Sequence, residues 1–345
     1  MDENTLNKKS KFANFNCTFR SHGIKHCMLD YFESIIWPAF TDYTIIREVK
    51  RSGTKFHLAD VKIIELPDGN LALVGIHIKK TFLDKSPDYD ETIGFFGDEY
   101  TVPSAPYSTF ILLLNNHRLI YFPNKKGAPS IDEFCATAKY KIREYISLQR
   151  QMLKNKWSDN DSVFDGVYYK YLQTFNTEVL EKLFPYPEIN IIPIESETLV
   201  KESFKTLKEI SVVTFKVYKP NNEPVNFNNI FERMDSIIDE TDSEAVATNL
   251  VKPTKFEVIE DAIITSSGHV DFKLIGKTEN DDDIILTPDK VSQKVNVQIS
   301  PGVPVEVNSI EVYNQVNHKS IIRETSSENL NVYQRVFGRL KTLIK

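Results

Sequence analysis

The sequence predicts an α+β fold with two domains of antiparallel strands and packed helices, followed by a C-terminal helix. In residues 107–122, an apolar run, the pair Asn115-Asn116 and a second apolar run are typical of a β-hairpin. Ser130 and Glu133 then form a capping-box pattern ahead of a long helical period. Alternating strands before the hairpin and short strands far behind it complete an order that favours antiparallel sheets.

The N-terminal domain is expected to cover residues 12–157 and to end in a long basic helix. A helix over residues 28–37 should stop at Pro38, because proline cannot continue the hydrogen-bond ladder. Residues 84–106 are acidic and interrupted by proline and glycine, which predicts a long surface loop. The remaining strands of this domain are expected over residues 12–19, 42–50, 54–66, 71–80, 107–114 and 118–122.

The second half of the chain predicts a helical connector over residues 158–187, which contains a helix at 168–184, and a C-terminal α+β domain over residues 188–325. An amphipathic helix over residues 326–345 should close the chain. Its apolar stripe can pack on its own domain or on a second copy, and its width favours a homodimer. Within the second domain we expect helices over 196–207 and 225–238, and strands over 189–194, 210–218, 255–259, 270–276, 283–286, 295–299 and 306–312.

Charge is distributed unevenly along the 345 residues. The net charge is −6, but residues 1–156 hold 22 basic against 18 acidic side chains, and the remainder holds 20 against 30. An anionic partner should therefore dock mainly on the first half. The three cysteines lack a CxxC spacing, which favours a cytoplasmic location. The longest apolar run, residues 110–114, is far below the roughly 20 residues that cross a bilayer, so we expect no direct membrane insertion.

Motifs that would name a reaction or a cofactor are absent from the sequence. Neither phosphate-cradling glycine loop nor a GxSxG elbow occurs, so we expect no cofactor and no catalytic residues. Four soft metal ligands, Cys17, His22, His26 and Cys27, lie close together, yet core cysteines and loop histidines explain them better than zinc. Arg20 and His26 have a loose ribonuclease spacing, but a strand that runs into a glycine turn does not present them together.

One enzymatic alternative is a metal-dependent nuclease of an antiphage system. Asp60, Glu65 and Lys79 have the layout of a restriction-type core. His77, however, stands where that core carries a carboxylate, and an oxygen ligand is what Mg²⁺ requires. A half-exposed strand that ends in two lysines explains the same residues.

Basic side chains give the strongest functional indication. Phosphate binding needs cationic donors and is largely independent of base sequence, although a charged run is often only a solvated helix face. The candidate phosphate ligands lie in the helix after residue 130, at nearby strand ends and in the last helix: Lys139, Lys141, Arg143, Arg150, Lys154, Lys79, Lys80, Lys125, Lys126, Arg335 and Arg339.

The order of these features resembles the RexA family, the sensors of the Rex phage-exclusion system. The resemblance covers nearly the whole chain through short, degenerate motifs, and this chain is longer at residues 84–106 and 130–184. The segments that carry it are Phe15-Asn-Cys-Thr-Phe-Arg-Ser21, Pro106-Tyr-Ser-Thr-Phe-Ile-Leu-Leu113, Ile189-Asn-Ile-Ile-Pro-Ile-Glu195, 210–220, Val225-Asn-Phe-Asn-Asn-Ile230, Lys252-Pro-Thr-Lys255, the strands at 271–285 and the closing basic helix.

The resemblance implies a cytoplasmic, DNA-binding homodimer without enzymatic activity. Such a sensor detects phage DNA or a DNA–protein complex and signals to a membrane-channel partner. Lys252 and Lys255 lie in the segment that corresponds to a basic part of the family and join the candidate DNA-binding residues. We therefore expect a non-catalytic protein that binds the phosphate backbone of double-stranded DNA, with the nuclease and a pure protein-interaction module as alternatives.

Overall fold

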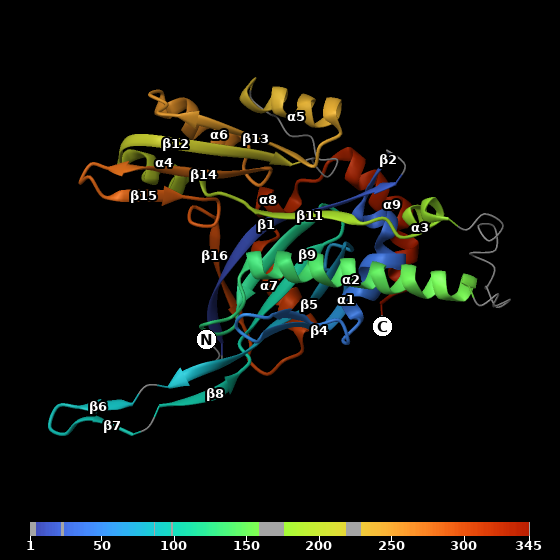
Figure 1. The fold of residues 1–345 in the computed structure, drawn as a ribbon, viewed down its shortest axis with the longest axis horizontal. Helices are drawn as coiled ribbons and strands as arrows, with labels where there is room; N and C mark the ends of the chain where they lie inside the picture. Colours follow the sequence, from blue (N-terminus) through green and yellow to red (C-terminus); the bar gives the residue numbers. More distant parts are fainter. Residues whose placement is uncertain are drawn as a thin grey trace.

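The computed structural model describes residues 5–21, 24–85, 87–97, 99–158, 176–218 and 229–344. Within them, a ten-stranded antiparallel sheet forms the body, and a separate four-stranded antiparallel sheet carries its own helices (Figure 1). The two sheets, the helices packed on them and the C-terminal helix confirm the predicted α+β class. No helix in these ranges is long and apolar enough to cross a membrane.

The first strand, β1 (Leu6–Ser21), pairs with four other strands. Residues 6–11 pair with β16 (Lys294–Ile299) and residues 13–19 with β11 (Pro187–Pro193). Residues 11–14 pair with β10 (Arg118–Pro123) and residues 18–21 with β2 (Ile24–Cys27). The sheet continues from β10 through β9 (Tyr107–Leu113), β5 (Leu71–Lys85), β4 (Thr54–Glu65) and β3 (Arg47–Val49), with β8 (Tyr100–Ser104) beside the outer part of β5.

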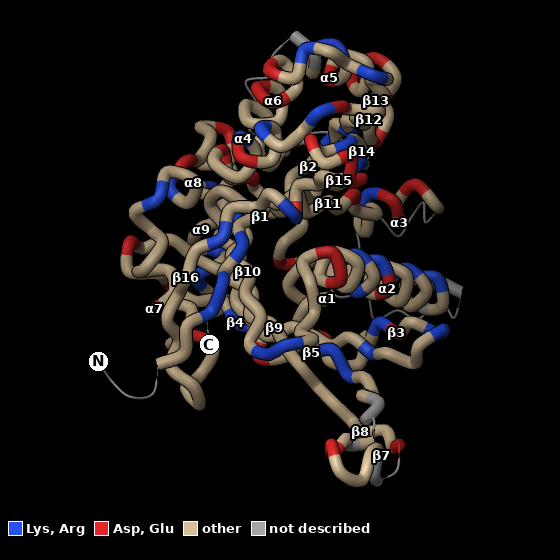
Figure 2. The backbone as a smooth tube through the Cα atoms, turned by 90° about the vertical axis from the view of Figure 1, so that its left-hand side faces the viewer, with Lys and Arg blue, Asp and Glu red and all other residues tan. Residues whose placement is uncertain are grey.

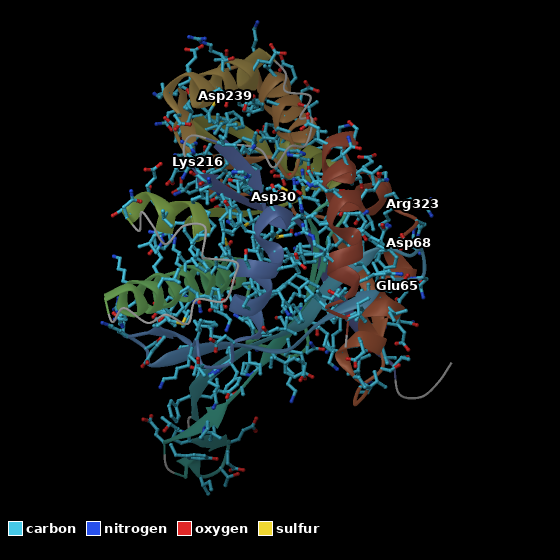
Figure 3. The ribbon with its side chains drawn as sticks, turned by 90° about the vertical axis from the view of Figure 1, so that its right-hand side faces the viewer. Asp30, Glu65, Asp68, Lys216, Asp239 and Arg323 are labelled. Carbon is cyan, nitrogen blue, oxygen red and sulfur yellow. The ribbon has the colours of Figure 1, made fainter. Side chains whose placement is uncertain are left out.

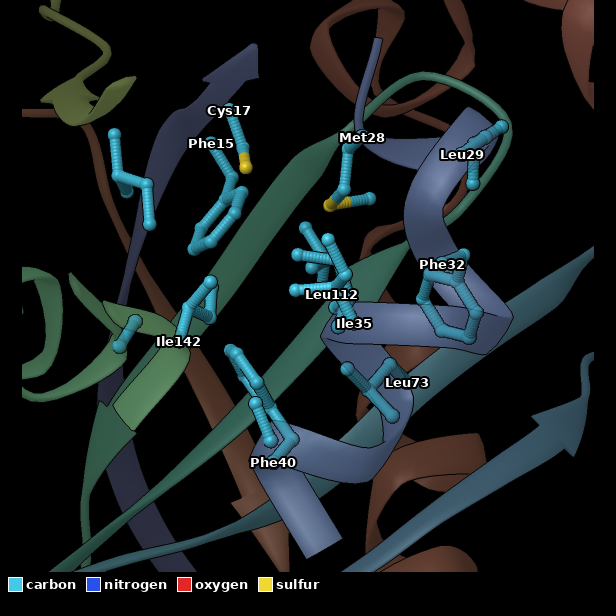
Figure 4. Close-up of a cluster of buried hydrophobic side chains, with 14 of the residues drawn as sticks. Phe15, Cys17, Met28, Leu29, Phe32, Ile35, Phe40, Leu73, Leu112 and Ile142 are labelled. Atoms are coloured by element: carbon cyan, nitrogen blue, oxygen red, sulfur yellow. The ribbon is translucent and has the colours of Figure 1, made fainter. Parts of the chain in front are cut away.

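Helices cover both faces of the large sheet. On one face lie α2 (Ile131–Ser158) and the short segments η1 (Met28–Tyr31), η2 (Phe32–Ile36) and α1 (Trp37–Thr41). Figure 4 shows how Phe15, Phe40 and Ile142 meet there. The other face packs on α7 (Val305–Val316), next to α8 (Ser320–Arg323). The apolar stripe of α9 (Ser327–Lys341), including Tyr333 and Leu340, belongs to the chain's own core, so that stripe is not available to a second copy.

The smaller sheet has the order β13-β12-β14-β15 and a hydrophobic core of its own. The strands β11 and β16, which the sequence assigns to the C-terminal domain, belong instead to the large sheet. The second unit is therefore built between them, from α4 (Glu197–Lys205), β12 (Leu207–Tyr218), α5 (Asn229–Thr241), β13 (Ala245–Val251), α6 (Phe256–Thr265), β14 (Val270–Thr278) and β15 (Asp283–Leu286).

Several elements differ from the prediction. The helical segment predicted to stop at Pro38 continues to Thr41, because Pro38 lies in the first turn of α1, where a missing amide costs no hydrogen bond. β13 was not predicted. Residues 255–259 and 306–312 are not strands but belong to α6 and α7. In α6 the buried residues Ile259, Ala262 and Ile263 repeat at helical spacing, which a five-residue window cannot reveal. Residues 84–106 are not a loop, because they form β8 and a hairpin of β6 (Asp88–Asp90) and β7 (Gly94–Phe96). Of the predicted helix at 168–184, only α3 (Thr177–Leu183) lies within the described residues.

A buried carboxyl group joins the two units. Glu195, which follows β11, accepts hydrogen bonds at Oε2 from Ser267 Oγ (2.6 Å) and from the Gly268 amide (2.9 Å). Gly268 has a φ of +76°, and a Cβ there would lie 2.9 Å from Ile194 Cγ1, so the turn requires glycine. Burial is the main reason why the pKa of Glu195 rises to about 7.

We predict that Glu195→Gln removes part of the pH dependence of stability. The native carboxyl holds its proton more tightly than the unfolded one, so its contribution falls as the pH rises from about 4.5 to about 7. Glutamine keeps an acceptor for both donors. Relative to wild type, the variant should gain about 3 kcal/mol of unfolding free energy across that range in urea titrations. Glu197→Gln, at an exposed position two residues away, is the control, and parallel curves for Glu195→Gln and wild type would contradict the assignment.

Candidate nucleic-acid interface

The long basic helix α2 does not present its cations as one face. Lys141 is fully buried, and its Nζ donates hydrogen bonds to the carbonyl oxygens of Asp42 (2.6 Å) and Ile45 (3.0 Å). Burial lowers its pKa to about 8. The interpretation of Lys141 as a phosphate ligand is therefore wrong, because its ammonium group satisfies two backbone carbonyls inside the protein.

Other predicted phosphate ligands are held by neighbouring groups. Lys79 Nζ lies 2.8 Å from Glu133 Oε1, and Arg339 lies 3.1 Å from Glu33 Oε2. Arg335 pairs with Asp30, which Figure 3 places on the η1 segment beside the red helix α9. Arg150 donates to the Phe184 carbonyl (2.9 Å) and stacks on Tyr186. These cations hold elements together and are less available to a polyanion.

The remaining predicted residues are exposed or half-buried but lie in separate regions. Arg143 and Lys154 are exposed on α2, whereas Lys139 is half-buried at the cleft described below. Lys80 is exposed on β5, directly opposite Lys55. Lys252 and Lys255 are exposed at the start of α6, in the smaller unit. Of the predicted set, only Lys125 and Lys126 join a larger group of lysines.

That group, the lysine strip, consists of Lys8, Lys9, Lys11, Lys125, Lys126 and Lys294. The β1–β16 pairing places Lys11 directly opposite Lys294, and Lys9 lies two residues further along β1. The loop after β10 adjoins them, because Lys8 Nζ donates to the carbonyl of Asn124 (2.6 Å), the residue before Lys125. Figure 2 shows these basic stretches of β1, β10 and β16 side by side. Three segments far apart in sequence thus bring six lysines to one end of the large sheet, with Lys9, Lys11 and Lys294 on one face and Lys8 on the other.

The strip is only partly neutralised. Within the described ranges, Lys11 is the only one of its six lysines in an ion pair, 2.6 Å from Asp289 Oδ1. Lys11 and Lys294 stand directly opposite each other in the sheet, and the ion pair of Lys11 with Asp289 offsets the repulsion between them. The sequence contained a signal for this surface in Lys8-Lys9-Ser10-Lys11, but the contribution of Lys294 depends on long-range pairing.

The cleft between the two units is lined mainly by acidic side chains, in contrast to the lysine strip. It encloses about 520 Å³ between α2, β11 and the ends of β12 and β14. Asp132, Asp271 and Asp289 line it together with Lys139. Burial, followed by the charge of Asp289, raises the pKa of Asp132, and burial also raises that of Asp271. Carboxylates that already repel one another disfavour a polyanion here.

The residues of the nuclease alternative do not converge. Asp60 is exposed at a bulge of β4, Glu65 pairs with Lys341 (3.0 Å), and Lys79 pairs with Glu133. His77 is fully buried, and burial lowers its pKa to about 3. Its Nδ1 lies 3.0 Å from Tyr121 Oη and its Nε2 lies 3.1 Å from Thr137 Oγ1. In the described part of the chain, no three His, Cys, Asp or Glu side chains form a group that could hold a metal ion.

Of the four candidate metal ligands near the start of the chain, the two cysteines are part of the hydrophobic core. Cys17 is fully buried, and Cys27 is the N-cap of η1, where its amide donates to Asp30 Oδ2 (3.1 Å). Burial raises the pKa of both thiols, which keeps them protonated. His22 lies outside the described residues.

Fold and site together define an α+β protein of two antiparallel sheets with a lysine-rich strip on the larger one. Comparisons with family models, with curated proteins and with solved structures find no match to this chain.

We predict that Lys141→Ala lowers stability and leaves DNA affinity unchanged. The substitution leaves two backbone carbonyls without their donor and opens a cavity, which should cost about 3 kcal/mol in urea unfolding. Arg143→Ala, exposed on the same helix, is the control and should stay within about 0.5 kcal/mol of wild type. Unaltered stability combined with weaker DNA binding would restore Lys141 as a phosphate ligand.

Proposed function

We propose that this chain binds the phosphate backbone of double-stranded DNA at the lysine strip, without catalysing a reaction on it. The observation that carries the proposal is the convergence of six lysines from β1, the loop after β10 and β16. Within the described ranges no ion pair neutralises the other five lysines of the strip besides Lys11, and a bound polyanion would do so. The strip, rather than α2, is therefore the proposed contact surface.

The spacing of the strip suits a duplex backbone. Lys9 and Lys11, two residues apart on one strand, are separated by about 7 Å at their Cα atoms. That distance matches about two base-pair steps of 3.4 Å along a DNA strand. Such contacts position a protein on the duplex and do not read its bases. We propose binding that is salt-dependent and largely independent of sequence.

We further propose a place for the protein in phage exclusion, as a cytoplasmic sensor of phage DNA or DNA–protein complexes. This part of the proposal is supported by the resemblance to the RexA family alone. It implies a membrane-protein partner that responds to the DNA-bound state. The lysine strip would supply the DNA contact that such a sensor needs.

We predict that Lys125→Glu combined with Lys126→Glu weakens duplex binding at least about tenfold in gel shifts at low salt, because two phosphate contacts become repulsive. The slope of log affinity against log salt should fall by about two. Both lysines are exposed, so folding should be unaffected.

The matched control is Lys273→Glu with Lys277→Glu, two exposed lysines of β14 outside the candidate set, which changes the charge by the same amount on the smaller unit. Equal losses in the two double variants would show a non-specific charge effect and remove the strip as the site. Failure of the wild type to shift duplex DNA at low salt would remove the function itself.

A further inference from the structure

A two-stranded arm projects from the large sheet. It consists of β5 beyond Thr81, β8 and the β6–β7 hairpin, and Figure 1 shows it extending well away from the rest of the molecule. Large apolar side chains stand on its surface: Phe82 is 64% exposed, Leu83 50%, Ile93 69% and Tyr100 59%. Such a density of exposed apolar groups marks an interaction surface.

The arm lacks the support that makes a ribbon stable by itself. A two-stranded ribbon is marginal in water, since stability usually needs a third strand or a covering helix. Beyond the pairing of Lys55 with Lys80, β4 no longer accompanies β5, and within the described residues β8 pairs only with β5. Both outer edges of the arm are therefore free to meet a partner.

The charge of the arm indicates the kind of partner. Residues 81–104 contain six acidic residues, Asp84, Asp88, Asp90, Glu91, Asp98 and Glu99, and one basic residue, Lys85. Glu91 and Glu99 are exposed. This balance repels nucleic acid and favours a protein surface that combines lysines with apolar groups.

The chain itself carries such a surface. On the sheet face that Leu6 shares with Lys8, three apolar side chains on β1 and on or just before α7 are exposed: Leu6 at 45%, Val303 at 37% and Val307 at 40%. We propose that the arm of one copy docks on the lysine strip of a second copy, and that the exchange is reciprocal about a twofold axis. Each copy then contributes its arm to one contact and its strip to the other, so the assembly closes as a dimer.

This inference goes beyond the proposed DNA binding and does not depend on it. Dimerisation would compete with DNA binding, because the arm and a phosphate backbone would contact the same lysines. DNA at sufficient concentration should then displace the arms and convert the dimer into DNA-bound monomers.

The test is the mass of the full chain in solution, measured by light scattering at micromolar concentration and low salt without DNA. The expected mass is twice the 39.7 kDa of one copy. Leu83→Ser with Tyr100→Ser should raise the dimer dissociation constant at least about tenfold, because these two exposed side chains share one face of the arm and both lose apolar contact. Both positions are exposed in the monomer, so circular dichroism and unfolding curves should match wild type.

Charge reversal locates the contact. Glu91→Lys with Glu99→Lys should weaken the dimer, as should Lys125→Glu with Lys126→Glu, and combining the two pairs should restore it. Restoration in the fourfold variant supports the arm-to-strip contact, because independent effects would add. A wild type that stays monomeric overturns the proposal and leaves the arm to a different protein.

An unchanged dimer dissociation constant in the arm variants overturns the proposal as well. The arm variants retain the whole strip, so they should still shift duplex DNA, whereas Lys125→Glu with Lys126→Glu should lose both activities. Failure of dimerisation and failure of DNA binding are therefore separate results.

Discussion

The structure depends on the backbone pairing of β1, one strand of sixteen residues that bonds to four others. Backbone amides and carbonyls that leave water must find partners, and a long strand satisfies this requirement with whichever segments reach its edges. Here those segments come from residues 24–27, 118–121, 187–193 and 294–299. The start of the chain is thereby joined to its last third, and the smaller unit is held between β11 and β16.

The same strand separates core from surface. Its later half carries Phe15, Cys17 and Phe19, which are buried against α2 and the η1–η2 segments. Its first half pairs with β16 and carries Lys8, Lys9 and Lys11, of which Lys11 lies directly opposite Lys294. Side-chain chemistry therefore fixes the register, because a shift by one residue would exchange these apolar groups with the buried polar Asn14, Asn16 and Thr18 of the other face. The geometry of the lysine strip follows from that register.

Local patterns in the sequence predicted the local structure and little beyond it. The hairpin of β9 and β10, the capping box before α2 and the helical stripe of α9 follow from nearest neighbours and are present. Membership of β11 and β16 in the large sheet could not be predicted, because it depends on pairing across more than 150 residues. For the candidate site, the sequence predicted the loop lysines Lys125 and Lys126 as phosphate ligands, but their place beside Lys8 depends on a contact across more than 100 residues. The burial of Lys141 had a signal, since Phe134, Ala138 and Lys141 share one helical stripe.

The separation of charge in space does not follow its separation along the sequence. The first half of the chain is net basic, yet it contains the acidic arm, and the net acidic second half supplies Lys294 to the strip. Acidic residues line the cleft between the units, whereas the lysines gather at the end of the large sheet that β1 and β16 form. The ion pair of Lys11 with Asp289 lies where the two regions meet. The register of β1 thus places a cationic and an anionic region next to each other, although their residues come from distant parts of the sequence.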